Sequence, residues 1–437
     1  MNHEIVWPAW LIATPLTVLF FWLALRAGRR LRLLLDTPTS KAKGVFIGQV
    51  ELVGAATIAR PERSFLAAAE CVWFHYRIEE QWARWETETY TDSKGNRKTR
   101  QVRKTGWTQV DAGGAQPPFF VEDETGAVLV RPEGAEIEAD TVFDRTVERG
   151  DALYYGKGPA GGISDSTGHR RFVETVLPLG GTVFVAGRAR ERSDVVAAEI
   201  AADAEQELFL ISRRGEGRVQ RGYRWGFWGC GFVYLLPLPV AWLVQAKQAV
   251  GLPVGWPAAA LAAGLALGLL LGWCWMAFNS LVQLRNRVLQ AASLIDVQLK
   301  RRADLIPRLV AVVAGLRDHE RTVQAEVAAL RAQSQATPVG QPGPDLAATA
   351  LTARIVSERY PELKSDAAFL ALQRELADTE TRVALARDYH NEIATHLNTR
   401  IDIIPDRWVA ALAGLKPQAL WQAEGFERAA VAVKLAE

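Results

Sequence analysis

Hydrophobic positions along the chain gather in three continuous apolar segments, separated by long regions in which apolar and polar residues alternate. The segments cover residues 6–25, 225–245 and 256–278, and no charged residue interrupts the second or the third. A helix needs about 20 consecutive apolar residues to cross the hydrocarbon core of a bilayer. The pattern therefore predicts three transmembrane helices, with the second and third joined as a hairpin over 225–278.

The region between the first two spans has the short period of β-strands. Aromatic and β-branched residues alternate with polar ones there, and glycines separate the runs. Strands are predicted at 48–54, 71–82, 119–130 (a hairpin that turns at 124–126), 151–156, 181–187 and 207–212, and a short helix at 194–204. These elements predict a compact, mostly antiparallel β domain over residues 39–215.

After residue 278 the apolar positions take the period of a helix. A linker rich in glycine and proline occupies 336–345, and helical patterns follow at 346–359 and 366–400. In the last helix, residues recur three and four positions apart as in a heptad seam: Phe369, Leu372, Leu376, Thr379, Val383, Ala386, His390, Ile393 and Leu397. Such helices pack antiparallel and bury one another's seams, so we expect an elongated helical bundle over 279–437.

Residues 295–310, IDVQLKRRADLIPRLV, show this helical pattern in detail. The predicted apolar stripe runs along Ile295, Leu299, Ala303, Ile306 and Val310. A ladder of charges four residues apart lies beside it, formed by Asp296, Lys300, Asp304 and Arg308. Pro307 is unfavourable inside a helix, so a bend is predicted near 303–307. Arg301 and Arg302 lie off the ladder and are predicted to be the residues here most free to contact a partner.

Charges beside the spans predict the orientation of the chain. Basic residues follow the first span, precede the second and follow the third, whereas the connection 246–255 carries one lysine. Cytoplasmic segments are enriched in lysine and arginine, which places residues 26–224 and the C-terminal region inside and the N-terminus outside. Because the basic residues follow the first span, we interpret residues 1–26 as an uncleaved anchor. Abundant alanine and arginine indicate a bacterium of high GC content, so we expect the bacterial inner membrane.

The sequence offers little candidate chemistry. A formal net charge of +2 gives no global bias toward nucleic acid. Cys71, Cys230 and Cys274 are far apart in sequence, so neither a zinc site nor a disulfide framework is indicated. GKGPAG at 156–161 has the spacing of a nucleotide-binding loop but opens no helix, and we interpret it as a structural loop. His390 is interpreted as a buried seam histidine rather than a metal ligand. No catalytic residues, cofactor, metal or small-molecule substrate are predicted.

Glycines recur every fourth residue in the third span, at Gly264, Gly268 and Gly272. They place three small residues on one helix face and allow a second helix to approach closely. One interpretation is packing of the second span against the third. The other is self-association of two copies through this stripe.

Four stretches of the β region carry a resemblance to a known domain. They are GQVELVG at 48–54, ARPERSFLAAAECVWFHYRIEE at 59–80, FFVEDETGAVLV at 119–130 and GTVFVAG at 181–187. They resemble the GIDE domain, a membrane-adjacent domain of mitochondrial ubiquitin ligases and bacterial membrane proteins. The ligases also carry a RING, whose zinc ions need cysteine and histidine ligands at fixed spacings. This chain has three unpaired cysteines, so ligase activity does not carry over.

The helical region carries a second resemblance. FNSLVQLRNRV (278–288), IDVQLKRRADLIPRLV, HE (319–320), YPELK (360–364), LQRELADTETRVALAR (372–387) and NTRIDIIP (398–405) follow one another in the order typical of the LemA family. The resemblance implies a membrane-anchored bacterial protein with a helical bundle and no established enzymatic activity. Family members tend to carry two Tyr-Asn pairs where this chain has His390-Asn391 and Leu397-Asn398, which puts a role of those tyrosines in doubt.

These features predict a multidomain membrane protein with a non-enzymatic function. We expect a scaffold or assembly protein whose helical bundle forms a homo-oligomer or binds another membrane or cytoplasmic protein. A ligase-like role in protein modification, implied by the GIDE resemblance, is one alternative. Binding of anionic lipids or of curved membranes is the other.

A basic segment of the β region, residues 90–106, generates a first test. It carries Lys94, Arg97, Lys98, Arg100, Arg103 and Lys104 against a single acidic residue. We interpret it as a solvated hairpin tip, with contact to anionic lipid headgroups as the alternative, because each basic residue near such a surface contributes about 1 kcal/mol. If the lipid contact is correct, replacing all six residues with Gln reduces the binding of the β domain to anionic liposomes in a flotation assay. Unchanged binding rejects the lipid contact.

Overall fold

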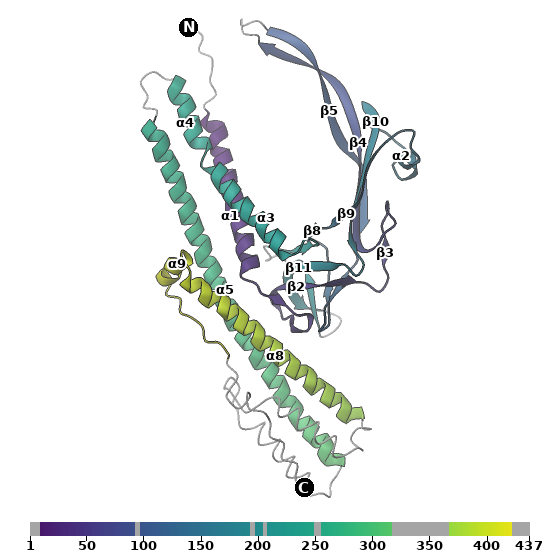
Figure 1. Cartoon of the computed structure of the whole chain (residues 1–437), viewed down its shortest axis with the longest axis vertical. Coiled ribbons are helices and arrows are strands. Elements are labelled where there is room, and N and C mark those ends of the chain that lie inside the picture. Colours follow the sequence, from purple (N-terminus) through teal and green to yellow (C-terminus); the bar gives the residue numbers. More distant parts are fainter. Residues whose placement is uncertain are drawn as a thin grey trace. The chain divides into compact units, whose positions relative to one another are not determined.

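The computed structural model describes residues 9–91, 97–192, 197–203, 208–248, 255–316 and 367–421 (Figure 1). The chain divides into two compact units. A helical unit combines residues 1–38 with residues 220–437, and a β unit covers residues 39–219. The predicted fold class is confirmed: the protein has a mostly antiparallel β region, long helices and three candidate membrane spans.

Three helical segments among the described residues are long and apolar enough to cross a membrane, judged by length and composition. They are Trp10–Leu35, Glu216–Lys247 and Gly255–Leu305. The first is helix α1 (Trp10–Leu35). The predicted spans therefore lie on helices, and each helix extends beyond the apolar segment that marked it.

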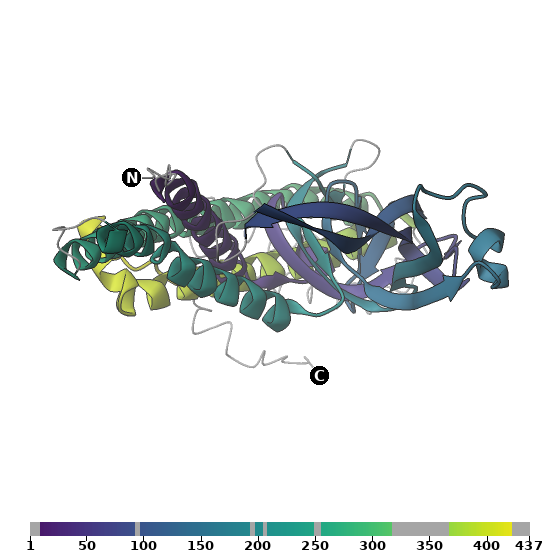
Figure 2. The ribbon, with the colours of Figure 1, turned by 90° about the horizontal axis from the view of Figure 1, so that it is seen from above.

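The second span is divided into α3 (Glu216–Tyr234) and α4 (Pro237–Gln248). Pro237 and Pro239 have no backbone N–H, so they cannot donate the helical hydrogen bonds that a continuous helix needs at these positions. Helix α1 packs against α4 and against the first part of α5, which also contacts α4 (Figure 1 and Figure 2). The three apolar segments thus form one group of neighbouring helices.

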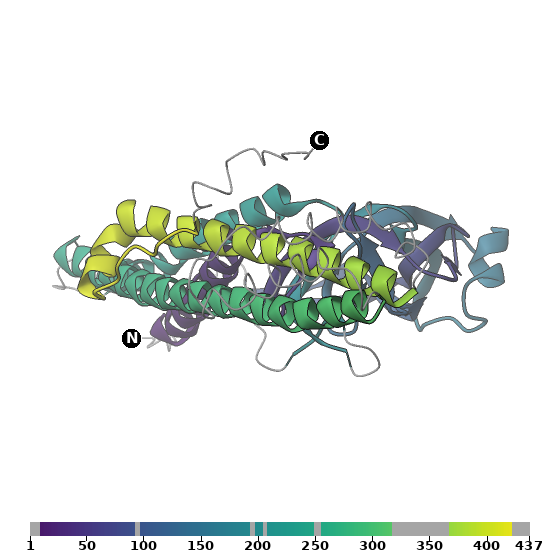
Figure 3. The same cartoon turned by 90° about the horizontal axis from the view of Figure 1, so that it is seen from below.

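Helix α5 (Gly255–Leu316) contains the third span and continues without interruption over 62 residues. At a rise of ~1.5 Å per residue it is about 93 Å long. Helix α8 (Ala367–Asp402) lies along the part of α5 beyond the span (Figure 3). The two helices are antiparallel, because Arg302 in the last third of α5 pairs with Glu380 in the first half of α8, whereas Ser280 earlier in α5 binds Arg400 at the end of α8.

The contact between α5 and α8 is a heptad seam on both helices. On α8 most of the predicted seam residues are buried: Leu376, Thr379, Val383, Ala386, His390, Ile393 and Leu397. The predicted seam residue Leu372 is half-buried, Ala394 is buried in addition, and the side chain of Phe369 lies outside the described residues. On α5 the buried residues alternate by four and three positions: Ala277, Leu281, Leu284, Val288, Ala291, Ile295, Gln298, Arg302 and Leu305. A mean spacing of about 3.5 residues keeps both stripes facing each other along the contact.

The apolar stripe predicted for residues 295–310 is wrong in its register. Ile295 is buried, but Ala303 is exposed, and Gln298 and Arg302 occupy the seam in its place. Two successive steps of four residues, from Ile295 to Ala303, rotate the predicted stripe by about 80° around a helix of 3.6 residues per turn. This rotation turns Ala303 away from α8, whereas alternating steps of three and four residues keep the seam facing it.

The backbone of α5 remains helical through Pro307. The side chains of Ile306, Pro307 and Val310 lie outside the described residues, and the bend near 303–307 stays a prediction. The linker at 336–345, the helical stretch at 346–359, and the HE and YPELK sequences also lie outside the described residues.

The larger sheet of the β unit closes on itself. Its ring consists of β2 (Gly48–Thr57), β6 (Phe119–Glu122), β7 (Ala127–Val130), β12 (Ala198–Ala201) and β11 (Thr182–Glu191), and β11 pairs back with β2. The shorter strands β1 (Thr39–Ser40), β13 (Leu210–Ser212) and β8 (Glu136–Glu138) extend it, and a 3-10 turn, η1, covers Ala42–Gly44. Closure encloses a core that includes Leu52, Val121, Val185 and Ile200, all fully buried.

The second sheet consists of β3 (Glu62–Arg63), β4 (Glu70–Thr91), β10 (Ser166–Pro178) and β9 (Asp140–Glu148), with β5 (Arg97–Ala115) paired to β4. Strands β4 and β5 form a long antiparallel hairpin in which Thr91 lies opposite Arg97 (Figure 1). The hairpin predicted around residues 90–106 is confirmed, and its tip at 92–96 lies outside the described residues.

Two predicted elements of the β unit are wrong. Residues 151–156 form a short helix, α2 (Ala152–Gly156), instead of a strand, because the Asp151 side chain accepts a hydrogen bond from the Leu153 N–H at 2.9 Å and caps the helix. The helix predicted at 194–204 is replaced by strand β12, which pairs with β11 on one side and β7 on the other. Pairing on both edges overrides the helical preference of its alanines and glutamate.

A buried ion pair joins the second sheet to the loop after α2. The side chains of Glu80 and Arg170 are fully buried, and Arg170 Nε and Nη2 donate to Glu80 Oε2 at 3.0 and 2.9 Å. Arg170 Nη1 also donates to the carbonyls of Tyr154 and Pro159 at 2.9 and 2.8 Å, and Nη2 donates to that of Gly161. GKGPAG therefore wraps around an arginine, in agreement with its interpretation as a structural loop.

Burial by itself would raise the pKa of Glu80, but hydrogen bonds from Ser166, Arg170 and Tyr154 outweigh it and hold the pKa below its ordinary value. Replacing Arg170 with Met should therefore leave a buried carboxylate without its partner and cost about 3–5 kcal/mol of folding free energy. Chemical denaturation followed by circular dichroism measures the loss. The neighbouring Arg171→Met is the control, since Arg171 pairs with Asp144 on the surface and its loss should cost less than about 1 kcal/mol. Equal losses would contradict the role assigned to Arg170.

Candidate functional site

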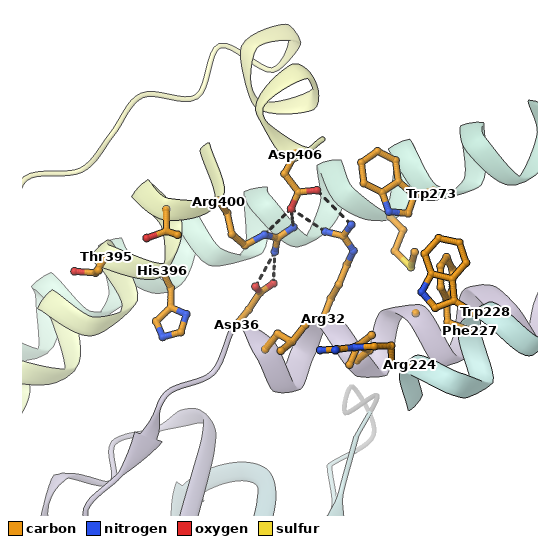
Figure 4. A pocket seen from close by; sticks show the side chains of 15 residues that line it. Arg32, Asp36, Arg224, Phe227, Trp228, Trp273, Thr395, His396, Arg400 and Asp406 are labelled. Atoms are coloured by element: carbon orange, nitrogen blue, oxygen red, sulfur yellow. Dashed lines mark hydrogen bonds and ion pairs between the residues drawn. The ribbon is translucent and has the colours of Figure 1, made fainter. Parts of the chain in front are cut away.

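The helical unit contains a chain of alternating charges, which we name the arginine–aspartate junction: Arg32, Asp36, Arg400 and Asp406. Arg400 Nη1 donates to the two carboxylate oxygens of Asp36 at 2.7 and 2.6 Å. Arg400 Nε donates to Asp406 Oδ2 at 2.7 Å, and Arg32 reaches both oxygens of Asp406 at 3.3 and 3.4 Å. Figure 4 shows Asp36 and Asp406 on two sides of the Arg400 guanidinium.

Local sequence places these four side chains at helix ends. Arg32 lies in the last turn of α1 and Asp36 is the C-terminal cap of that helix, four residues on. Arg400 lies in the last turn of α8, and Asp406 opens the short helix α9 (Asp406–Leu412). Basic residues at a helix C-terminus and acidic residues at an N-terminus oppose the partial charges of the helix ends. The junction therefore fastens the end of α1 to the turn between α8 and α9.

Ser280 and Arg287 attach α5 to the same place. Ser280 Oγ donates to Asp36 and accepts a bond of 2.6 Å from Arg400 Nη1. Arg287 Nη1 donates to Thr37 Oγ1 at 2.7 Å and to the Asp36 carbonyl at 3.3 Å. Asp36 is thus held from two helices, α5 and α8.

The side chains of the junction are largely buried from solvent, and this burial affects the pKa of Arg400. Asp36 is 5% exposed, and the Arg400 side chain is 16% exposed. Desolvation by itself would lower the pKa of Arg400, but the charges of Asp36 and Asp406 raise it above its ordinary value. Arg400 is a permanent cation between two carboxylates and therefore acts as a structural cross-link, not as a proton donor.

A cavity of about 600 Å³ borders the junction (Figure 4). Its lining is mixed: the junction residues and Arg224 contribute charge, and Leu31, Leu35, Phe227, Trp228, Trp273 and Met276 contribute apolar surface. Arg32 also lies over the ring of Trp273, 5.4 Å from its centroid. The cavity therefore suits a ligand that has an apolar part and a charged part.

Two asparagines of α8 hold the segment that follows α9. Asn398 exchanges two hydrogen bonds with the backbone of Gln418, at 2.8 and 2.7 Å, and Asn391 does the same with Trp421, at 2.9 and 2.7 Å. Seven helical residues span about 10.5 Å, and three extended residues span about 10 Å. The match explains why asparagines two turns apart can bind every third residue of an extended segment. Asn391 and Asn398 belong to the His-Asn and Leu-Asn pairs noted in the sequence, and they act on the backbone without any tyrosine.

The structure places the predicted partner-contact residues in pairs with α8. Arg301 Nη2 lies 3.2 Å from Glu375 Oε1, and Arg302 Nε lies 3.0 Å from Glu380 Oε1. The prediction that both are free for a partner is therefore wrong for Arg302, which is buried in the seam. Arg302 takes this place because its long side chain crosses the seam edge and its charge reaches the opposing helix.

The charge-ladder residues lie on α5, beside the seam. Lys300, Asp304 and Arg308 are exposed and Asp296 is half-buried. Charges in such positions contribute little to stability, so the ladder is best described as the solvated side of the helix. Its contribution to helix stability stays a prediction.

The glycine stripe of the third span faces neighbouring helices at two of its three positions. A Cβ at Gly268 would lie 3.0 Å from Tyr234 Oη, and a Cβ at Gly272 would lie 3.1 Å from Leu25 and Phe21. Among the described residues, nothing lies within 4 Å of such an atom at Gly264. Gly268 and Gly272 thus permit close packing of α3 and α1 within the chain, and self-association through the stripe stays a prediction.

The basic hairpin residues lie on β5, apart from Lys94, which is outside the described residues. Arg97, Lys98, Arg100, Arg103 and Lys104 are all exposed. Arg100 pairs with Glu88 at 3.1 Å, and Lys104 pairs with Glu86 at 2.7 Å across the hairpin. Acidic residues of β4 thus offset part of the positive charge, which the sequence segment taken alone did not indicate.

The part of the chain that the structure describes contains no candidate metal centre. Among the described residues, no group of three or more His, Cys, Asp or Glu is arranged to hold a metal ion. His390 is buried in the seam, and burial lowers its pKa below the ordinary value, although a hydrogen bond to Asn391 acts in the opposite direction. Burial also raises the pKa of Cys71 to about 11, so its thiol stays protonated near neutral pH.

The junction was not predicted from the sequence, although three of its residues lie in or beside stretches that the sequence analysis considered. Arg400 and Asp406 lie within and directly after NTRIDIIP, and Arg32 belongs to the basic cluster after the first span. A useful signal was Asp36, an acidic residue four positions after Arg32 in an otherwise basic flank. Its partners Arg400 and Ser280 lie 364 and 244 positions away in the sequence, and periodicity within one helix carries no information about them.

Comparison with known proteins agrees with this architecture. Residues 291–435 match the model of the LemA family, and residues 87–240 match the GIDE model, described as E3 Ubiquitin ligase. Protein LemA of Metamycoplasma hominis is 26% identical over 157 residues, which is 34% of this chain and 71% of that protein. The chain thus combines a C-terminal region that is similar to the LemA family with a GIDE-like region before it, and both resemblances found in the sequence are confirmed.

The junction can be tested through Arg400. Replacing Arg400 with Gln should leave Asp36 and Asp406 as buried carboxylates without their shared partner and lower the stability of the helical unit by about 3 kcal/mol. Thermal unfolding of the detergent-purified chain, followed by circular dichroism at a helical wavelength, measures the effect. Arg407→Gln is the matched control, since Arg407 is exposed on α9 one residue after Asp406. If the two variants unfold alike, the junction does not hold the helices together.

Proposed function

We propose that the protein is a non-enzymatic scaffold of the bacterial inner membrane, and that its helical bundle binds further copies of itself. One observation carries the proposal. Helix α5 is continuous: its first part is a membrane span, and its second part packs against α8 through the heptad seam. A rigid helix of this kind presents a bundle at a fixed place relative to the membrane, which an assembly protein requires.

The exposed side of α5 supplies a surface for self-association. Leu289 and Val297 are 52% and 59% exposed, and they lie eight residues apart on the same side of the helix, with Ser293 between them. Apolar residues repeated at this spacing form a stripe that a second helix can cover. Outward charges such as Lys300 flank the stripe and can orient the two copies.

The proposed orientation follows from the charges beside the spans. Basic residues follow the first span, precede the second and follow the third, and such residues are enriched on the cytoplasmic side. The N-terminus then lies outside, and the β unit and the α5–α8 pair are cytoplasmic. The charged junction lies beyond the apolar part of α1 and is consistent with the end of the first span before Arg32.

A ligase-like role in protein modification is the second candidate, and the GIDE match is the observation that favours it. Two facts argue against it. The three cysteines are free and widely separated in sequence, and the buried Cys71 thiol is protonated. Transfer of ubiquitin by the purified chain, with activating and conjugating enzymes present, would overturn the non-enzymatic proposal. Binding of anionic lipid by the basic hairpin is compatible with scaffolding and is tested by the liposome experiment.

Self-association predicts a defined oligomer in detergent. Mass photometry of the full chain should show one species of several copies, and Leu289→Glu combined with Val297→Glu should convert it to monomer, because four or more like charges would meet in the contact. Ala377→Glu combined with Ala384→Glu adds the same charge to exposed positions of α8 and should leave the oligomer intact. A wild-type monomer at every concentration contradicts the proposal.

A further inference from the structure

The cavity beside the arginine–aspartate junction lies at one end of the group of three apolar segments, and each of the three segments contributes to its lining. On α1 its lining residues, from Gly28 to Asp36, follow the apolar segment. On α3 they are Arg224, Phe227 and Trp228, where the second apolar segment begins. On α5 they are Trp273 and Met276, where the third apolar segment ends. All three spans thus meet the cavity at the boundary between hydrocarbon and headgroups.

Exposed aromatic residues mark the same boundary. Trp225 and Trp228 are 77% and 65% exposed at the start of the second apolar segment. Tryptophan is enriched at the interface between membrane and water, since its ring is apolar and its N–H is polar. Because Trp228 lines the cavity, we infer that the cavity opens at the depth of the lipid headgroups.

Helix α9 gives a second and independent indication of lipid at this level. Its Val409 and Ala410 pack in one cluster with Ala277, at the end of the third apolar segment. Its opposite side, together with the preceding turn, presents large apolar side chains that are more than half exposed: Ile403, Ile404, Trp408 and Leu412. Such a concentration of apolar surface beside a membrane span fits a short helix lying in the bilayer interface.

The charges that line the cavity indicate that a bound ligand carries a negative charge. Three arginines and two aspartates line it, so one positive charge is left over when His396 is neutral. The aspartates are occupied by Arg32 and Arg400. Arg224 is exposed and, among the residues the structure describes, forms no ion pair. Figure 4 shows Arg224 beside the end of α1, at the edge of the cavity.

We propose that this cavity binds one anionic phospholipid, whose phosphate contacts Arg224 and whose upper acyl chain packs against Phe227, Trp228 and Met276. A half-open apolar cavity at the membrane boundary is filled by lipid, because water there would leave apolar surface wetted. The excess positive charge favours a headgroup with a net charge of −1 over a zwitterionic one. This inference goes beyond the scaffold function and does not depend on it.

Native mass spectrometry of the full chain in detergent tests the proposal with two lipids of identical acyl chains, phosphatidylglycerol and phosphatidylcholine. The first should bind at least about fivefold more tightly. Arg224→Gln should abolish most of that preference, and Arg218→Gln should retain it. Arg218 is the matched control, since it is an exposed arginine on the same helix and does not line the cavity.

Further experiments distinguish binding of the whole lipid from binding of its phosphate group alone. Inorganic phosphate and glycerol 3-phosphate, added at the same concentrations, should compete weakly, because they lack the acyl chains that the apolar lining contacts. Leu35→Trp enlarges an exposed lining residue and should weaken the binding of both lipids. Equal affinity for the two lipids, equal loss in the two arginine variants, or full competition by glycerol 3-phosphate would each overturn the proposal. Circular dichroism of each variant confirms that it is folded.

Discussion

The ion pairs around Arg400 are the interaction on which the helical unit depends. Asp36 ends the first span and Asp406 begins the helix after α8, and one guanidinium binds both carboxylates. A partly buried arginine with two acidic partners has its charge compensated and its hydrogen bonds directed, so the desolvation of each ion is balanced locally. Removing any member leaves a charge without its partner in a nearly dry place, which is why the ends of α1 and α8 and the adjoining part of α5 are held as one group.

The long helix α5 connects this group of helices to the contact with α8. Its first part packs with α3 and α1 through small residues such as Gly268 and Gly272, and its second part packs with α8 through a heptad seam. Polar side chains interrupt that seam at Gln298, Arg302, Thr379 and His390. Polar residues in a seam reduce stability but specify register and partner. The pair α5–α8 is therefore defined in its alignment more by these residues than by its leucines.

The β unit is also stabilised by a buried arginine that binds a carboxylate. Glu80 and Arg170 are fully buried, and the arginine also binds carbonyls of the loop after α2. A loop rich in glycine cannot bury enough apolar surface to fix its own path, so the arginine fixes it by hydrogen bonds. What looked like a nucleotide-binding spacing in the sequence is a loop shaped to supply carbonyls to a cation.

Local patterns in the sequence determined the spans, most strands of the β unit, the long helices and the α8 seam, since each depends on apolar period and length within one element. They also pointed to the two family resemblances. The sequence failed where a distant partner decides the outcome: residues 198–201, which were predicted to be helical, form a strand by pairing on two edges, and the α5 stripe took the register that faces α8. The junction and the cavity were decided by tertiary structure alone. Arg32, Asp36, Arg400 and Asp406 are ordinary surface residues in the one-dimensional pattern, and only the folded chain brings their charges within 4 Å of one another.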